Sequence, residues 1–348
     1  MSNSPLEQLE FVLNKHQKHY NAERLLEDLT ALAREVNTSL VTDAKPRPIS
    51  ELATRAVDVW FKPGYFNGSP SGFPALDSVT GGFKPGELTV IGARPGTGKT
   101  FLMLQFCLNM AGMNVPSAWI SFDLTADQVL LKMLSNVSEI STLRLRNGEL
   151  RQEDQQKVRK MAEKLGKLPI FIDDSPAQNV FSIRQKCGQL VKEHGVRVVF
   201  IDYLQMIKTQ GRQRTRDEEV ALITRELKRT ARELNISIIA ASQLSRAVEQ
   251  RGGNKRPQLS DLRESGAIEQ DADMVLFIYR PEMAGITQDE NGYSTEGLAE
   301  VIVAKNRSGM IGSAELGFVA HCGKYSDNVP REVGFINEQR IKEIEDDL

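Results

Sequence analysis

The sequence predicts an α/β fold in which a mostly parallel central sheet is flanked by helices. From about Gly72 onward, strand-like and helix-like segments alternate, which is typical of parallel strands joined by helical crossovers. The strand-like segments are rich in Val, Ile and Phe and are mostly apolar on both faces, as in a sheet that helices cover on both sides. A glycine-rich loop between the first of these strands and the next helix is the third indication, because phosphate-binding loops occupy that position.

Each predicted strand is a short apolar run that is followed by a helical pattern. One helix is expected over 101–110, and another over 220–234, where the apolar residues fall on one face. The predicted strands are Leu88–Ile91, Ala118–Phe122, Ile170–Asp173, Val198–Asp202, Ile236–Ser242, Met274–Tyr279 and Glu300–Ala304.

A helical region and a linker are expected before this core. Apolar residues at helical spacing within 6–36 predict a short helical segment, and Pro46 and Pro48 mark a linker after it. The linker contains an amphipathic helix, Ile49–Trp60, whose spacing alone favours packing on its own domain. The expected organisation is a helical N-terminal region at 1–45, a linker at 46–70, a core domain at 71–335 and an acidic tail at 336–348.

Composition excludes several classes of protein. The chain has 348 residues, 40% of them hydrophobic, and no uninterrupted apolar run near the ~18 residues that a membrane-spanning helix needs. The polar start Met1–Glu10 does not resemble a secretory leader. Three separated cysteines, Cys107, Cys187 and Cys322, predict reduced thiols and no metal site. We therefore expect a cytoplasmic protein without membrane contact.

The segment Ala93–Thr100 predicts a phosphate-binding loop, although Ala93 stands where the strict pattern has glycine. Glycines allow backbone N–H groups to turn toward an anion, Lys99 supplies a charge for the β and γ phosphates, and the Thr100 hydroxyl can ligate Mg²⁺. The predicted cofactors are ATP and Mg²⁺. The residues expected to bind the nucleotide are Arg94, Pro95, Gly96, Thr97, Gly98, Lys99, Thr100 and Arg280.

Two further acidic positions complete this chemistry. Asp202 ends an apolar strand, where a carboxylate can hold the Mg²⁺ shell through water, so it is the expected Walker B residue. Tyr203 follows it, so the carboxylate that polarises the attacking water must come from another strand. Asp123 is favoured for this role, and Asp173 and Asp174 are alternatives at the end of a third strand.

Several long motifs, in the same order, closely resemble the motor domain of DnaB-type replicative helicases. The resemblance covers about residues 49–325 and implies a RecA-like ATPase that forms a ring hexamer around single-stranded DNA and moves 5′ to 3′ during replication. The motifs are the blocks 92–100, 171–174, 201–206, 242–246 and above all 256–273, Arg-Pro-Gln-Leu-Ser-Asp-Leu-Arg-Glu-Ser-Gly-Ala-Ile-Glu-Gln-Asp-Ala-Asp.

The resemblance also assigns roles that spacing alone does not. Gln243 resembles the residue that senses nucleotide and couples it to the DNA loops. Lys305 and Arg307 look like the basic pair that reaches the γ-phosphate in the adjacent subunit, whereas without the family Arg307 would be a solvated turn residue. The helix Ile49–Trp60 is then expected to dock on a neighbouring subunit.

Two long basic connections, 208–216 and 246–263, follow core strands. Such loops are usually solvated surface, but six copies facing the inside of a ring would track a phosphate backbone. No aromatic residue lies between these basic residues, so we expect sequence-independent binding. The residues expected to contact DNA are Arg212, Arg214, Arg251, Lys255, Arg263, Glu264 and Gly266.

The chain departs from the family pattern in two places. Asp123 stands where the family usually has Glu, and its shorter side chain predicts slower hydrolysis or a substitute carboxylate. Only about 45 residues precede the linker, which argues against primase docking and suggests a truncated or mobile-element variant. The resemblance also implies a helicase loader as a further partner. Two alternatives stay open: a RadA/RecA-like repair ATPase, and a ring subunit that binds ATP and DNA but hydrolyses little.

Overall fold

The computed structural model describes residues 13–15, 25, 28–30, 48–51, 53, 57, 68–175, 179–209, 215–245, 247–251, 255–262 and 266–329. The chain divides into two compact units, Met1–Tyr65 and Phe66–Leu348. All the described strands belong to the second unit. In the described part of the chain, no helix combines the length and the apolar character that crossing a bilayer requires.

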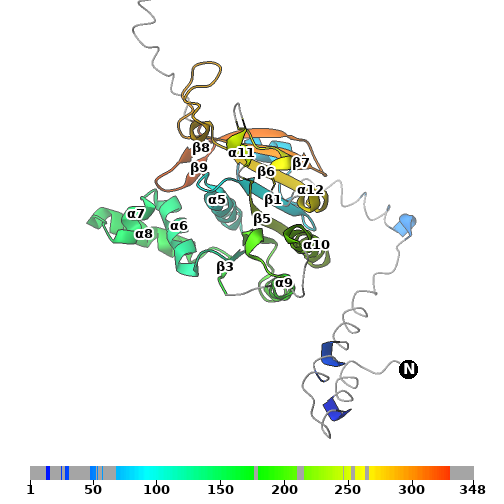
Figure 1. Ribbon diagram of the computed structural model, residues 1–348. Helices are drawn as coiled ribbons and strands as arrows, with labels where there is room; N and C mark the ends of the chain where they lie inside the picture. Colours follow the sequence, from blue (N-terminus) through cyan, green and yellow to red (C-terminus); the bar gives the residue numbers. More distant parts are fainter. Residues whose placement is uncertain are drawn as a thin grey trace, which may run out of the picture. The chain divides into compact units, whose positions relative to one another are not determined.

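The second unit is built on one nine-stranded sheet with the order β3-β2-β4-β5-β1-β6-β7-β8-β9 (Figure 1). Strands β1 to β6 are parallel, and β7, β8 and β9 extend one edge in antiparallel pairing. The mostly parallel sheet predicted from the sequence is therefore confirmed. The strands are β1 Leu88–Ala93, β2 Ser117–Ser121, β3 Ile170–Asp173, β4 Val198–Asp202, β5 Ser237–Gln243, β6 Met274–Tyr279, β7 Leu298–Asn306, β8 Gly312–Val319 and β9 Lys324–Ser326.

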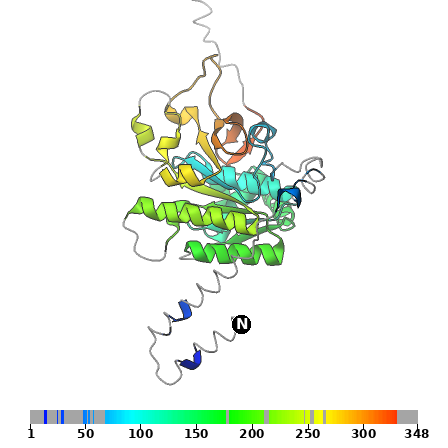
Figure 2. The ribbon, with the colours of Figure 1, turned by 90° about the vertical axis from the view of Figure 1, so that its right-hand side faces the viewer.

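Helices cover both faces of this sheet. On one face, α5 and α6 pack on a core that includes Phe106 and the stacked rings of Trp119 and Phe200. On the other face lie α9, α10 and α12, and Figure 2 shows α9 and α10 side by side. The helices are α4 Pro74–Thr80, α5 Lys99–Gly112, α6 Ala126–Ser138, α7 Thr142–Asn147, α8 Gln152–Leu165, α9 Val180–His194, α10 Arg216–Leu234, α11 Ala247–Gln250 and α12 Gly266–Asp271, with 3₁₀ turns at Leu204–Met206, Leu259–Asp261 and Pro281–Ala284.

Helix α10, the longest in the described part of the chain, shows how local sequence sets an element. Thr215 caps its start, since its hydroxyl accepts a hydrogen bond from the Glu218 backbone N–H at 3.2 Å. Acidic side chains in the first turn complement the positive end of the helix dipole. Val220, Ile223 and Leu227 are fully buried against the sheet, as the sequence periodicity predicted. The cap and the apolar face together hold α10 behind the strands that form the site.

Candidate active site

The candidate site lies at the carboxyl edge of the parallel strands. In the register of the sheet, Ala93 at the end of β1 pairs with Gln243 of β5, and Ser121 at the end of β2 pairs with Asp202 of β4. Four strand ends therefore meet at one edge, which is where open α/β sheets bind ligands. This edge carries the predicted phosphate loop and both predicted acidic residues.

The phosphate loop runs from the end of β1 into the first turn of α5. Gly96 and Gly98 have φ angles of 82° and 99°, which other residues rarely adopt. A Cβ atom at Gly98 would also lie only 2.5 Å from the Tyr325 hydroxyl, so the loop needs glycine here for space as well as for its backbone. The Thr97 hydroxyl closes the turn by donating to the Arg94 carbonyl at 2.7 Å. The N-terminus of α5 and this loop form an arrangement suited to an anion.

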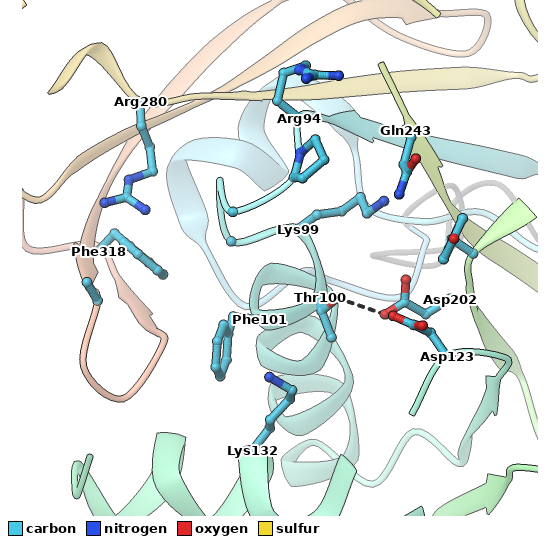
Figure 3. Close-up of a pocket in the computed structure, with 15 residues that line it drawn as sticks. Arg94, Lys99, Thr100, Phe101, Asp123, Lys132, Asp202, Gln243, Arg280 and Phe318 are labelled. Carbon is cyan, nitrogen blue, oxygen red and sulfur yellow. Dashed lines mark hydrogen bonds between the residues drawn. The ribbon is translucent and has the colours of Figure 1, made fainter. Parts of the chain in front are cut away.

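The loop forms one wall of a cleft of about 390 Å³, shown in Figure 3. Every residue of the predicted loop except Ala93 and Thr97 contributes to the lining, together with the other predicted cleft residues Asp123, Asp202, Gln243 and Arg280. The complete lining is Arg94, Pro95, Gly96, Gly98, Lys99, Thr100, Phe101, Asp123, Lys132, Asp202, Tyr203, Gln243, Arg280, Phe318 and Ala320.

Lys99 and Asp202 are the buried charges of the cleft. The Lys99 ammonium donates to the Ser242 carbonyl at 3.3 Å, and the Thr100 hydroxyl donates to an Asp202 carboxylate oxygen at 2.8 Å. Burial lowers the pKa of Lys99, partly opposed by Asp202 and Asp123. Burial raises the pKa of Asp202, partly opposed by Lys99 and by the hydrogen bond from Thr100. Each charge is thus held in the cleft largely by the other.

The oxygens of Thr100 and Asp202 fit a magnesium ion. Mg²⁺ prefers hard oxygen ligands, retains several waters, and is usually bound by one or two protein oxygens together with substrate phosphates. A hydroxyl and a carboxylate that lie 2.8 Å apart beside a phosphate loop match this donor set.

Asp123 is the other carboxylate in the cleft, and Figure 3 shows it beside Asp202. The two alternatives to Asp123 do not line the cleft. Asp173 forms an ion pair with Lys186 at 2.5 Å, and Asp174 accepts a hydrogen bond from the first backbone N–H of α6 at 2.7 Å. The geometry therefore favours Asp123 as the carboxylate that can reach a water in the cleft.

Gln243 ends β5 inside the cleft, and Figure 3 shows its side chain beside Lys99. Its backbone N–H donates to the Gln205 side-chain oxygen at 3.3 Å, and the Gln205 amide nitrogen donates to the Ser242 hydroxyl at 3.0 Å. Gln205 therefore bridges the segments that follow β4 and end β5, and fixes the backbone from which Gln243 extends.

Lys305 and Arg307 lie elsewhere and do not line this cleft. The Lys305 ammonium donates to carbonyls at the end of α12, including that of Ala272 at 2.7 Å. An Arg307 guanidinium nitrogen lies 3.5 Å from a carboxylate oxygen of Asp273, and another donates to the Gln270 carbonyl. Within one chain, neither side chain is brought to the phosphate loop.

The predicted DNA contacts are only partly described. Arg212, Arg214, Arg263 and Glu264 lie outside the described residues. Arg251 forms an ion pair with the buried carboxylate of Asp261, and Lys255 has a positive φ of 52°. Gly266 begins α12 and is exposed. The sheet edge that carries the cleft thus also carries the described part of the second basic connection.

Five cleft residues were not predicted from the sequence. Phe101 follows Thr100 directly, and the Lys132 ammonium lies 4.6 Å from the centre of its ring. Tyr203 follows Asp202, which was a signal that could have placed it in the cleft. Phe318 and Ala320 come from the end of β8 and the turn after it. The Arg280 guanidinium lies 4.3 Å from the centre of the Phe318 ring.

These features define a phosphate-loop protein. They are a parallel sheet with a glycine loop, a lysine and a threonine at the start of the following helix, and a buried aspartate on a nearby strand. A family model described as DnaB-like helicase C terminal domain matches residues 68–327, and the chain belongs to this family. The match favours the helicase interpretation over the repair-ATPase alternative.

Similar proteins agree with this assignment. The chain is 42% identical over 264 residues to Replicative DNA helicase DnaC of Bacillus subtilis (strain 168), covering 75% of this chain and 57% of the relative. It is 38% identical over 328 residues to Replicative DNA helicase DnaB of Geobacillus stearothermophilus, covering 87% and 71%. The chain thus spans between about half and three quarters of the length of these relatives.

Two solved structures are similar as well. One is described as an ATPase domain; it matches with a TM-score of 0.74 at 34% identity and covers 81% of this chain and 99% of that one. The other, "The Structure Of A DnaB-Like Replicative Helicase And Its Interactions With Primase", matches with a TM-score of 0.77 at 30% identity, covering 92% and 75%. These neighbours confirm the predicted RecA-like fold.

Proposed function

We propose that the chain is the ATP-hydrolysing motor of a replicative DNA helicase, which assembles as a ring of six and moves 5′ to 3′ on single-stranded DNA. The observation that carries the proposal is the arrangement of Lys99, Thr100 and Asp202 at the carboxyl edge of the sheet, in a chain of the DnaB-like family. The buried lysine and the helix N-terminus suit a triphosphate, and the hydroxyl–carboxylate pair suits Mg²⁺.

In this proposal the loop and Lys99 bind and orient the β and γ phosphates of ATP. Thr100, and Asp202 through water, would hold Mg²⁺, which would supply positive charge to the phosphates. Asp123 accepts the proton of the attacking water, and Gln243 responds to the γ-phosphate. Lys305 and Arg307 reach the γ-phosphate of an adjacent subunit, which agrees with their distance from the cleft of their own chain.

Single-stranded DNA is the proposed track, and the basic residues after β4 and β5 are its proposed contacts. Arg251 and Lys255 are the described members of this set, and their charges suit phosphate oxygens without base discrimination. A helicase loader is a further proposed partner, and the cytoplasm is the proposed location. One structural neighbour is described as a DnaB-like replicative helicase with its interactions with primase.

A second candidate function follows from Asp123. A ring subunit that binds ATP and DNA but hydrolyses slowly would have the same cleft, with a carboxylate one methylene too short to align the water. This subunit would bind nucleotide normally and release little phosphate.

Steady-state ATPase measurements with and without single-stranded DNA, followed by strand displacement on a forked duplex, test both functions. A helicase is expected to show DNA-stimulated turnover and to unwind a fork with a 5′ tail. Binding of nucleotide and DNA without turnover would support the second candidate. The Lys99→Ala protein is the control, because any turnover that it shows measures contaminating ATPase activity.

A further inference from the structure

The Arg94 side chain leaves the phosphate loop instead of pointing toward the phosphate position. Figure 3 shows it extending away from Lys99 and Thr100. Its Nη1 donates to the Leu244 carbonyl at 2.9 Å, while Nε and Nη2 donate to one carboxylate oxygen of Glu249 at 2.9 and 2.6 Å. The Arg94 carbonyl meanwhile accepts the Thr97 hydroxyl inside the loop. One residue therefore closes the turn of the loop and also binds a segment outside it.

The segment that Arg94 binds leads into the second basic connection. Glu249 lies on α11, and Val248 beside it is buried in the core. Two residues further on, Arg251 pairs with the buried Asp261 and donates to the Arg256 carbonyl at 3.2 Å. The short helix α11 is thus attached on one side to the phosphate loop and on the other side to the basic connection.

Stability alone does not account for the Arg94–Glu249 pair. Side-chain exposure is 59% for Glu249 and 18% for Arg94. Ion pairs with a partner this exposed contribute little to folding, because solvent screens them. Two N–H groups of one guanidinium that donate to the same carboxylate oxygen do fix orientation, because both bonds must stay aligned on that oxygen. The pair is therefore better suited to fixing the position of α11 relative to the phosphate loop than to stabilising the fold.

We propose that Arg94 and Glu249 form a positioning pair that couples the phosphate loop to α11 and to the basic residues Arg251 and Lys255, so that nucleotide and single-stranded DNA change each other's affinity. The inference rests on the proposed function, because ATP and DNA are taken as the ligands of the two sites. When phosphates draw in the loop N–H groups, Arg94 moves with the loop and carries α11. DNA bound to Arg251 and Lys255 shifts α11 and, through Glu249 and Arg94, the phosphate loop, so DNA changes nucleotide affinity by the same factor, as linkage requires.

The test measures the affinity of a non-hydrolysable ATP analogue with and without a thymidine oligonucleotide, in the full chain. The unmodified protein should bind the analogue about 5- to 150-fold more tightly when DNA is present, the usual range for coupled sites. In Glu249→Gln this ratio should fall below about twofold. Analogue affinity without DNA, DNA affinity without analogue, and basal turnover should stay unchanged.

Glu193→Gln is the matched control, because Glu193 is 52% exposed, lies on α9 and contacts the side chains of Gln189 and His194 on the same helix. It should keep the ratio of the unmodified protein. Arg94→Gln and the double variant with Glu249→Gln complete a double-mutant cycle, in which the double variant should lose no more coupling than either single one.

The outcomes separate the inference from the function. If Glu249→Gln keeps the full ratio, or loses DNA affinity even without nucleotide, the positioning role is wrong while the helicase proposal stands. Additive losses in the cycle would likewise overturn the pair. If DNA leaves analogue affinity unchanged in the unmodified protein, the positioning role also fails, whereas the helicase proposal fails only if DNA-stimulated turnover and strand displacement are absent.

Discussion

Lys99 and Asp202 share the cleft in a state that burial disfavours for both. Burial lowers the pKa of the lysine and raises the pKa of the aspartate, and each is opposed by the charge of the other. Unfavourable electrostatics of this kind are common at functional sites, where a ligand relieves them. Triphosphate and Mg²⁺ would supply the missing charges to Lys99 and Asp202, respectively.

Removal of the lysine is the first test at the residue scale. Lys99→Ala should reduce ATP turnover by at least about 100-fold, the scale of losing one preorganised donor to a developing charge. The fold should persist, because the substitution removes a loop charge and no core volume. Turnover and thermal melting measure the two effects. Lys160→Ala, an exposed lysine on α8, is the control, and normal turnover in Lys99→Ala would refute the site.

The second residue test concerns the short carboxylate. Asp123→Glu should maintain or increase ATP turnover, because the extra methylene restores the reach of the usual family residue toward the water. Asp123→Asn should lose turnover, since an amide cannot accept the proton. Steady-state phosphate release compares the three proteins. Loss of activity in Asp123→Glu with a harmless Asp123→Asn would make Asp123 structural and place the base elsewhere.

The raised pKa of Asp202 predicts that the ionised carboxylate lowers the stability of the fold while activity requires it. Because its pKa is raised from 3.8, the folded state holds the proton more tightly than the unfolded state, so this group lowers stability as pH rises through the folded pKa. The penalty is absent below the unfolded pKa and is complete once the pH exceeds the folded pKa. Asp202→Asn should therefore raise the melting temperature at pH 7 without nucleotide, abolish turnover, and lose its stability advantage toward pH 4. A lower melting temperature at pH 7 would contradict this account.

Among the elements, the hairpin of β8 and β9 supports the phosphate loop from the core side. The Tyr325 hydroxyl donates to the carbonyls of Thr97 and Gly98 at 3.4 and 3.3 Å, and its ring packs 4.6 Å from that of Phe318. These contacts turn the two carbonyls toward the hairpin, away from the anion position. The hairpin thus helps to keep the loop N–H groups available.

Removing this support should affect stability and binding together. Tyr325→Ala should cost about 3–5 kcal/mol of unfolding free energy, as for large buried aromatic residues, and should weaken nucleotide binding. Tyr325→Phe keeps the ring and should cost about 1 kcal/mol, the net value of a hydrogen bond. Urea unfolding and nucleotide titration measure both. Equal nucleotide affinity in Tyr325→Ala and the unmodified protein would show that the hairpin does not support nucleotide binding.

Sequence patterns identified the strands in which every residue is buried to a similar degree. The predicted strands Ile170–Asp173, Val198–Asp202 and Met274–Tyr279 have the observed bounds, because short apolar runs flanked by turns are recognisable. Both β8 and β9 were missed, since β8 mixes exposed and buried positions and β9 has only three residues. Their place depends on pairing with β7, which is a contact between segments and leaves little local signal.

The same distinction applies to the site across the whole molecule. The phosphate loop is local in sequence, and six of its eight residues line one wall of the cleft, while their binding of nucleotide stays a prediction. Lys132 and Phe318 reach the cleft from α6 and β8, and only the folded topology brings them there. The roles of Lys305 and Arg307 depend on a second chain, so they stay predictions.

A mixing experiment tests the division of the site between subunits. Arg307→Ala should bind nucleotide but lose turnover, and mixing it with Lys99→Ala should restore part of the activity. Each working interface needs a phosphate loop from one chain and Arg307 from another, so mixed rings contain some intact pairs. ATPase assays on rings verified to be mixed provide the measurement. No recovery in such rings would exclude action in trans.

The contact between Arg307 and Asp273 bears on rings whose subunits hold different nucleotides. Asp273 also accepts the Leu88 N–H at 2.8 Å and pairs with Lys228 at 2.5 Å, so it remains satisfied when Arg307 leaves. The 3.5 Å separation and the half-exposed guanidinium make this a weak resting position. An arginine held there, by this carboxylate and by its hydrogen bond to the Gln270 carbonyl, would remain on its own chain beside an empty neighbour. It would move to the neighbouring subunit only when a triphosphate bound there attracts it more strongly than these two partners do.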